Sequence, residues 1–108
     1  MKNVITVTLN ANERALMISA INGYFVYDTE KKPIRKIYKW IKLKLMMAKK
    51  GTMQLRLKKI NADCLGFALW LVKEERIVIN ESVDKAMIDR LINSLLHPIK
   101  TEERTVVA

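Results

Sequence analysis

Apolar and polar residues alternate over residues 3–9, and the apolar residues on one side of the chain are Ile5, Val7 and Leu9. A period of two predicts a β-strand with one buried face. Asn10 and Glu13 follow at the spacing of a capping box, which predicts a helix over residues 11–23. The dipeptide Asn22-Gly23 is also typical of a two-residue hairpin turn, and the sequence leaves this alternative open.

A second helical pattern spans residues 33–50, between Pro33 and Gly51. Proline fits the first turn of a helix, and glycine fits the left-handed position after its end. The apolar positions at helical spacing are Ile34, Ile37, Tyr38, Ile41, Leu45 and Ala48. We therefore expect a helix that buries this stripe, although the alternation Lys-Leu-Lys-Leu at residues 42–45 also fits a strand.

The second half of the chain gives the same signals in the same order. Residues 52–57 alternate and predict a strand, and residues 61–72 predict a helix that is apolar on most sides and central to the core. A short third strand is predicted at residues 76–80. Ser82 is the predicted N-cap of a last helix, which ends before His97-Pro98.

Laying one half of the chain over the other shows matching apolar patterns, for which an internal duplication and chance similarity of amphipathic elements are both open explanations. An offset of 48 aligns the apolar positions of the strands and first helices, and an offset of 50 aligns those of the second helices, with almost no identity. The predicted fold is helix-dominated α+β, with about four helices packed on a small antiparallel sheet of two or three strands. We expect one compact domain at residues 1–100, with candidate halves 3–50 and 52–97, and a loose tail at 101–108.

The net charge of +9 belongs to one segment of the chain. Residues 31–59 hold twelve Lys or Arg and no Asp or Glu, and the rest of the chain holds eight basic and eleven acidic residues. Localised positive charge can attract a polyanion, but lysines on a solvated helix give the same signal. Charge alone therefore does not identify a partner.

Cysteine content and hydropathy indicate where the protein acts. The only cysteine is Cys64, which excludes an intramolecular disulfide and fits a reducing compartment. No apolar run approaches the roughly 18 residues of a membrane span, and the first residues do not resemble a signal peptide. We therefore expect a cytoplasmic protein without a membrane span.

The helix predicted at residues 33–50 has two features outside its buried stripe on a helical wheel. One flank groups Met46 with the basic residues Arg35, Lys39, Lys42 and Lys49. The side away from the core holds an apolar line, which we define as Trp40, Leu43 and Met47. Four explanations are open: burial on two sides within the fold, self-association, nucleic-acid binding, and adsorption to an anionic membrane.

The apolar line is the predicted partner or dimer interface, since Trp and Met are favoured at such contacts. The alternative is sequence-tolerant binding of DNA or RNA, with lysines on phosphates and Trp40 stacked on a base. The residues predicted for nucleic-acid binding are Arg35, Lys36, Lys39, Lys42, Lys49, Lys50, Lys58 and Lys59. Because lysine predominates over arginine and no zinc-finger, RNP-like or helix-turn-helix pattern is present, we expect such binding to depend on charge and shape.

No group of residues predicts catalysis. His97 lies at a helix end, where its charge would suit the helix dipole, and Cys64 is expected to be a buried, inert thiol. The acidic residues lack metal-site spacing, and the three glycines form no phosphate-binding loop. We predict no catalytic residue, metal site, cofactor or small-molecule substrate. The expected function is a small interaction or regulatory module, homodimeric or bound to another protein.

Overall fold

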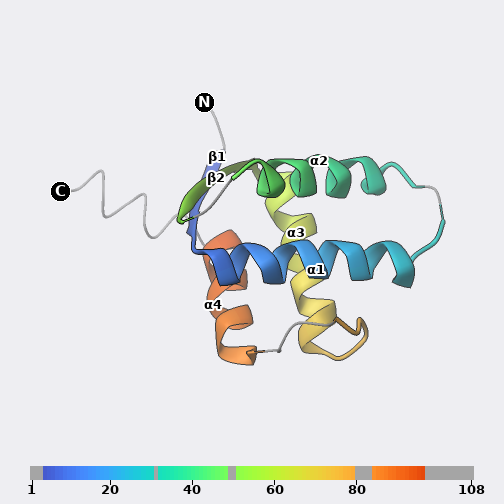
Figure 1. The fold of residues 1–108 in the computed structure, drawn as a ribbon. Helices are drawn as coiled ribbons and strands as arrows, with labels where there is room; N and C mark the ends of the chain where they lie inside the picture. Colours follow the sequence, from blue (N-terminus) through green and yellow to red (C-terminus); the bar gives the residue numbers. More distant parts are fainter. Residues whose placement is uncertain (1–3, 31, 49–50, 80–83, 97–108) are drawn as a thin grey trace.

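The computed structural model describes residues 4–30, 32–48, 51–79 and 84–96, and Figure 1 shows how their elements are arranged. In chain order the elements are β1 (Val4–Leu9), α1 (Ala11–Tyr27), α2 (Ile34–Met47), β2 (Met53–Lys58), α3 (Lys59–Lys73) and α4 (Lys85–Leu96). The four helices and the two-stranded antiparallel sheet of the described residues confirm the predicted helix-dominated α+β fold.

The sheet has one buried and one exposed face. β1 and β2 are antiparallel, with Ile5 opposite Leu57 and Val7 opposite Leu55, and these four side chains are buried. The alternate positions are exposed, namely Thr6, Thr8, Gln54, Arg56 and Lys58. The helices therefore pack on one face of the sheet, as the period of two in both strands requires.

α1 begins at the predicted capping box. The side chain of Asn10 accepts a hydrogen bond from the amide of Glu13, and the carboxylate of Glu13 accepts one from the amide of Asn10, both at 2.8 Å. The helix continues through Asn22 and Gly23, so the hairpin alternative is wrong. Gly23 is needed for packing, because the side chain of Ile77 occupies the space that a β-carbon at position 23 would take.

α2 is helical through residues 42–45, so the alternative of a strand there is wrong. The helix ends at Met47, earlier than predicted, and Ala48 already has an extended backbone. Gly51 has the expected left-handed backbone, with φ of 80°, but in the turn that leads into β2. The carbonyl oxygen of Gly51 accepts a hydrogen bond from the guanidinium of Arg14, which ties α1 to the start of the second half.

α3 is the central helix, as predicted, and contacts α1, α2 and α4 (Figure 1). Its buried residues are Ala62, Leu65, Gly66, Ala68, Leu69, Leu71 and Val72. The helix is closed by Glu75, which has φ of 61°. The amides of Arg76 and Glu75 donate to the carbonyls of Leu71 and Val72 at 2.8 and 3.0 Å, which is the pattern of a Schellman motif.

The third strand predicted at residues 76–80 is not formed over its described part, residues 76–79. The amides of Arg76 and Ile77 both donate to the carbonyl of Leu71, at 2.8 and 3.3 Å. This backbone therefore closes α3 and does not join the sheet. The β-branched run at residues 77–79 that predicted a strand lies in an irregular segment, in which the Ile77 side chain packs against Gly23 of α1.

α4 begins after Asp84, whose carboxylate accepts hydrogen bonds from two amides of the first turn at 3.0 and 3.2 Å. The predicted cap Ser82 and the predicted end at His97-Pro98 lie outside the described residues, as does the tail at 101–108.

The two halves of the chain repeat the order strand, helix, helix. Val7 pairs with Leu55, which is also its equivalent at an offset of 48. When a local twofold axis relates two antiparallel strands, equivalent residues of the two strands pair with each other at the axis, as Val7 and Leu55 do here. The architecture thus agrees with a duplicated unit, while a common origin of the halves and a single domain over residues 1–100 stay predictions.

Candidate interaction surface on helix α2

The buried stripe fixes the orientation of α2. Its fully buried residues are Tyr38, Ile41 and Leu45. The ring of Tyr38 packs against Tyr24 of α1, with centroids 4.4 Å apart, and its hydroxyl donates to the carbonyl of Cys64 in α3 at 2.5 Å. Burial raises the pKa of Tyr38, so this hydroxyl keeps its proton. The predicted stripe is confirmed for these three residues, Ile34 and Ile37 are partly buried beside them, and Ala48 lies beyond the end of the helix. The opposite side of α2 faces outward.

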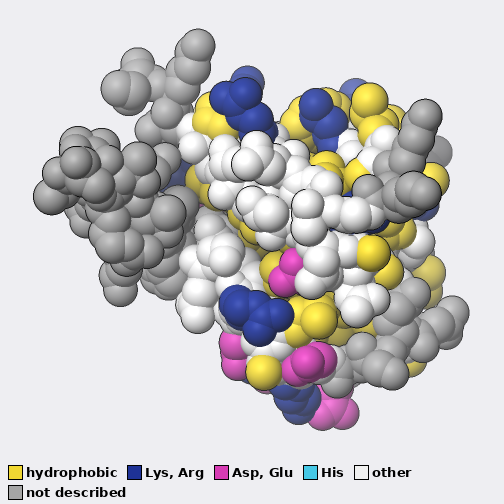
Figure 2. Space-filling view, turned by 60° about the vertical axis from the view of Figure 1, so that its left-hand side comes forward, with side chains coloured by type: hydrophobic (Ala, Val, Ile, Leu, Met, Phe, Trp, Pro, Cys, Tyr) yellow, Lys and Arg dark blue, Asp and Glu magenta, His cyan; other side chains and the backbone are white. Residues whose placement is uncertain are grey.

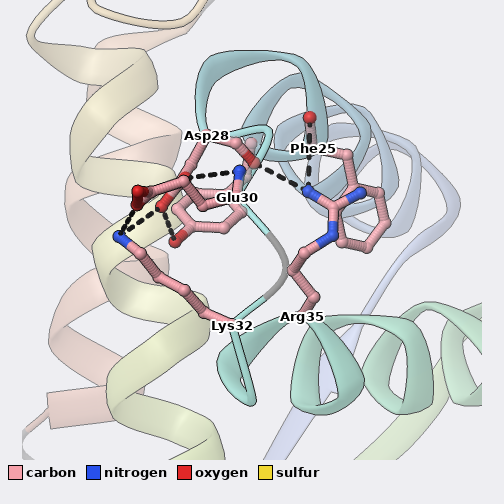
Figure 3. A network of polar contacts seen from close by, with 6 residues as sticks. Phe25, Asp28, Glu30, Lys32 and Arg35 are labelled. Carbon is pink, nitrogen blue, oxygen red and sulfur yellow. Dashed lines mark hydrogen bonds and ion pairs between the residues drawn. The ribbon is translucent and has the colours of Figure 1, made fainter.

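Arg35 lies at the start of α2 and is engaged inside the fold (Figure 3). Its guanidinium donates to the carbonyls of Phe25 and Asp28 at 3.4 and 2.7 Å, and it lies 4.7 Å from the centre of the Phe25 ring. A cation at this place complements the carbonyl end of α1. Arg35 was predicted to contact nucleic acid, but the structure places it in the junction between α1 and α2, apart from the exposed lysines.

Asp28 closes the connection between α1 and α2 (Figure 3). Its carboxylate accepts hydrogen bonds from the Tyr24 hydroxyl and the Lys32 ammonium, each at 3.1 Å, and from the Glu30 amide at 3.2 Å. The ammonium of Lys32 also lies 3.1 Å from the carboxylate of Glu30. The hydrogen bond from Lys32 lowers the pKa of Asp28, so the connection holds an ionised carboxylate.

The apolar line lies on the outside of α2, as predicted. Trp40 is 41% exposed, Leu43 63% and Met47 73%, and Met46 on the adjoining flank is 58% exposed. The Lys44 ammonium lies over the Trp40 ring, 5.3 Å from its centre. Burial within its own fold therefore does not account for the line. A contiguous apolar surface of this kind is typical of a contact site.

The lysines of α2 have no acidic partner among the described residues. Lys36 and Lys39 are exposed, Lys42 is partly buried, and Lys44, which the sequence analysis did not include in the site, is also exposed. None of these four forms an ion pair with an acidic side chain of the described residues. Figure 2 shows Lys and Arg side chains beside apolar ones at the upper edge without acidic ones next to them, whereas basic and acidic side chains lie together lower down.

The other cations predicted for nucleic-acid binding are divided. Lys58 is exposed at the end of β2, and Lys59 is exposed but lies 3.6 Å from Asp63. Residues 49–50 lie outside the described part of the chain. Arg56 is exposed on the outer face of the sheet and adds a cation that was not predicted as a site residue, although its phase in the alternating strand indicates exposure.

A second exposed apolar group lies on α3 and was missed by the sequence analysis, which expected this helix to be covered on most sides. Phe67 and Trp70 are 45% and 40% exposed and stack on each other, with ring centroids 6.1 Å apart. The guanidinium of Arg76 lies 5.9 Å from the centre of the Trp70 ring. Here the aromatic rings cover one another, in contrast to Leu43 and Met47 on α2.

The groups considered for catalysis show no activation. Cys64 is partly buried, and burial raises the pKa of its thiol, which is the opposite of an activated nucleophile. His97 lies outside the described residues. Across residues 4–30, 32–48, 51–79 and 84–96, no three His, Cys, Asp or Glu side chains are grouped closely enough to hold a metal ion.

No family model, curated protein or solved structure matches the chain. In the part of the chain that the structure describes, no helix combines the length and apolarity needed to cross a membrane. A functional assignment therefore depends on the surface chemistry of α2.

Proposed function

We propose that the protein is a small non-enzymatic interaction module that binds a second copy of itself through the outward side of α2. The observation that carries this proposal is the exposure of Trp40, Leu43 and Met47 along one side of a helix whose other side is fully packed. Dimerisation would remove this apolar surface from water. The single cysteine, Cys64, supports a place in the reducing cytoplasm.

Charge gives this dimer a characteristic salt dependence. A twofold contact along α2 brings the lysines of both copies together, and residues 31–59 contain no acidic residue to offset them. Salt screens repulsion between exposed charges. We therefore expect the dimer to become tighter as the ionic strength rises.

Light scattering of the purified, nuclease-treated protein at low and high salt tests the proposal. Trp40→Glu should give a folded monomer, because it places a charge in the apolar line. Trp70→Glu is the matched control: it changes the same residue type at similar exposure on α3 and should leave the dimer intact. A monomeric wild-type protein, or a dimer broken only by Trp70→Glu, would exclude α2 as the dimer contact.

A second candidate function is sequence-tolerant binding of DNA or RNA. The observation that favours it is the set of α2 lysines that form no ion pair within the described part of the chain, joined by Arg56 and Lys58 on β2. Affinity for a labelled single strand or duplex should then fall steeply with salt, opposite to the dimer. It should also fall when Lys39→Glu and Lys42→Glu are combined. Affinity that ignores salt would count against phosphate contacts.

A further inference from the structure

β2 has a free edge. The sheet of the described residues has two strands, so β2 pairs with β1 on one side only. In an antiparallel pair, every second residue directs its N–H and C=O groups away from the partner strand. These groups are a template for a further strand.

A groove of about 330 Å³ follows this free edge. Lys44 and Met47 line it from the end of α2, and the four consecutive residues 53–56 line it from β2. Consecutive strand residues point to opposite faces, and no residue of β1 lines the groove. The groove therefore runs along the edge of the strand and not over a face of the sheet.

The charge of the groove selects between occupants. Lys44 and Arg56 line it, no acidic residue does, and neither cation forms an ion pair with a described acidic side chain. A second β2 placed against this edge would bring Arg56 and Lys58 close to their own copies, and such charges discourage self-pairing of edge strands. An acidic segment would meet complementary charge instead.

We propose that the free edge of β2 binds an extended acidic peptide segment as an added strand. The backbone of the segment pairs with β2, and its carboxylates contact Lys44 and Arg56. Met47 and Met53 form flexible apolar walls that fit different side chains. Backbone pairing supplies affinity in this mode of recognition, and side chains at alternate positions supply specificity.

This site goes beyond the proposed dimer contact. The two surfaces share Met47, but the dimer depends on Trp40 and Leu43, which do not line the groove. Peptide binding by the Trp40→Glu monomer would show that the edge acts without the dimer. A dimer that persists in an Arg56→Glu variant would show that the dimer forms without the peptide site. Failure of one proposal is therefore distinguishable from failure of the other.

The first test measures binding of a fluorescent eight-residue peptide in which Glu alternates with Val or Thr. Arg56→Glu should weaken binding about tenfold or more, because it reverses a charge that lines the groove. Lys36→Glu is the matched control, since it makes the same charge change on α2 outside the groove. Equal losses in both variants would mean that only general charge attraction is at work and would overturn the proposal.

The second test separates backbone pairing from charge. A peptide with every second amide N-methylated keeps all its carboxylates but cannot donate hydrogen bonds from one of its two edges. Two such peptides are needed, one methylated at the odd and one at the even positions. The peptide whose methylated edge faces β2 should no longer bind. Binding of the unmodified peptide should also slow hydrogen exchange of backbone amides in residues 53–58. Equal affinity for the unmodified peptide and both methylated forms, unchanged exchange, or no binding of the unmodified peptide would overturn the proposal.

Discussion

Helices α2 and α4 are the second helices of the two halves of the chain, and their buried sides are alike. α2 buries Tyr38, Ile41 and Leu45, and α4 buries Ile88, Leu91 and Leu95. An offset of 50 relates all three pairs, and the spacing places each set on one side of its helix. Both helices therefore bury an apolar stripe with the same spacing against the core.

The outward sides of the two helices differ. In α4, Asp89 lies 2.6 Å from Lys73 of α3, and Arg90 lies 3.5 Å from Glu13 of α1. The same offset places Trp40 of α2 at the position of Arg90, and Trp40 remains 41% exposed. Two outward residues of α4 thus form ion pairs with neighbouring helices, whereas Trp40, Leu43 and Met47 of α2 are exposed apolar side chains. This difference supports the contact proposed on α2.

The largest predicted effect tests the shared scaffold. Ile41→Ala and Leu91→Ala each remove a buried aliphatic side chain, and each should lower the free energy of unfolding by about 2–5 kcal/mol. Urea unfolding followed by circular dichroism measures the change. Met46→Ala, on the exposed side of α2, is the control and should shift the free energy by less than about 0.5 kcal/mol. A large loss in only one of the two core variants would show that the halves are not equivalent.

A smaller effect tests a contact that only the first half has. Gly23→Ala should lower the free energy of unfolding by about 1–3 kcal/mol, because the new methyl group meets Ile77. This loss would appear although alanine favours a helix over glycine by about 1 kcal/mol. The offset of 48 puts Leu71 at this place in the second half.

A double-mutant cycle identifies the cause of that loss. In an Ile77→Ala background the clashing methyl group is absent, so Gly23→Ala should cost clearly less than in the wild type. A Gly23→Ala protein that is more stable than the wild type would contradict the close approach.

These contacts also show why the sequence predicted the order of the elements but not all of their details. Strand and helix periods are local, and six of the seven elements that they predicted are formed, in the predicted order. The dipeptide Asn22-Gly23 has turn chemistry, but packing against Ile77 decides its conformation. Residues 77–79 have the β-branched side chains of a strand, but the amides of Arg76 and Ile77 bond to the end of α3. In both places the deciding partner is distant in the sequence or belongs to the end of another element.

The candidate surface was predictable where it depends on helical phase alone. The phase of the buried stripe placed Trp40 on the outside of α2 without knowledge of the fold. The role of Arg35 was not predictable, because its partners are carbonyl groups at the end of another helix. The groove beside Arg56 also depends on how the end of α2 lies next to β2, which no local pattern contains.

The next prediction compares how the two halves start their first helix. Asn10 caps α1 with its side chain, whereas Lys58, its equivalent at an offset of 48, precedes α3 without a side-chain cap. Asn10→Ala should therefore lower the free energy of unfolding by about 1 kcal/mol. Lys58→Asn should raise it by a smaller amount, because the backbone at position 58 is already extended. Chemical denaturation of both variants checks the opposite signs, and a loss in both would mean that position 58 cannot act as a cap.

The smallest predicted effect separates the halves by pH. The hydrogen bond from Lys32 lowers the pKa of Asp28 in the first half, so its contribution to stability is complete above the ordinary value of 3.8. That contribution is lost as the pH falls through the lowered pKa that Asp28 has in the folded state. In the second half, the hydrogen bond that Lys73 donates to Asp89 raises the pKa of Lys73. The contribution of Lys73 to stability is complete below its ordinary pKa of 10.5 and is lost as the pH rises through its pKa in the folded state.

Unfolding measured in urea across the pH range tests this pair of opposite signs. Asp28→Asn should flatten the loss of stability in acid. It should also remove part of the loss in alkali, because the hydrogen bond to Asp28 raises the pKa of Lys32. Lys73→Met should flatten only the alkaline side. Both effects should be small, because Lys32 and Asp89 are each 51% exposed and solvent weakens such pairs. Equal acid sensitivity in the wild type and Asp28→Asn would mean that the connection between α1 and α2 closes without this carboxylate, and that Arg35 alone holds the end of α1.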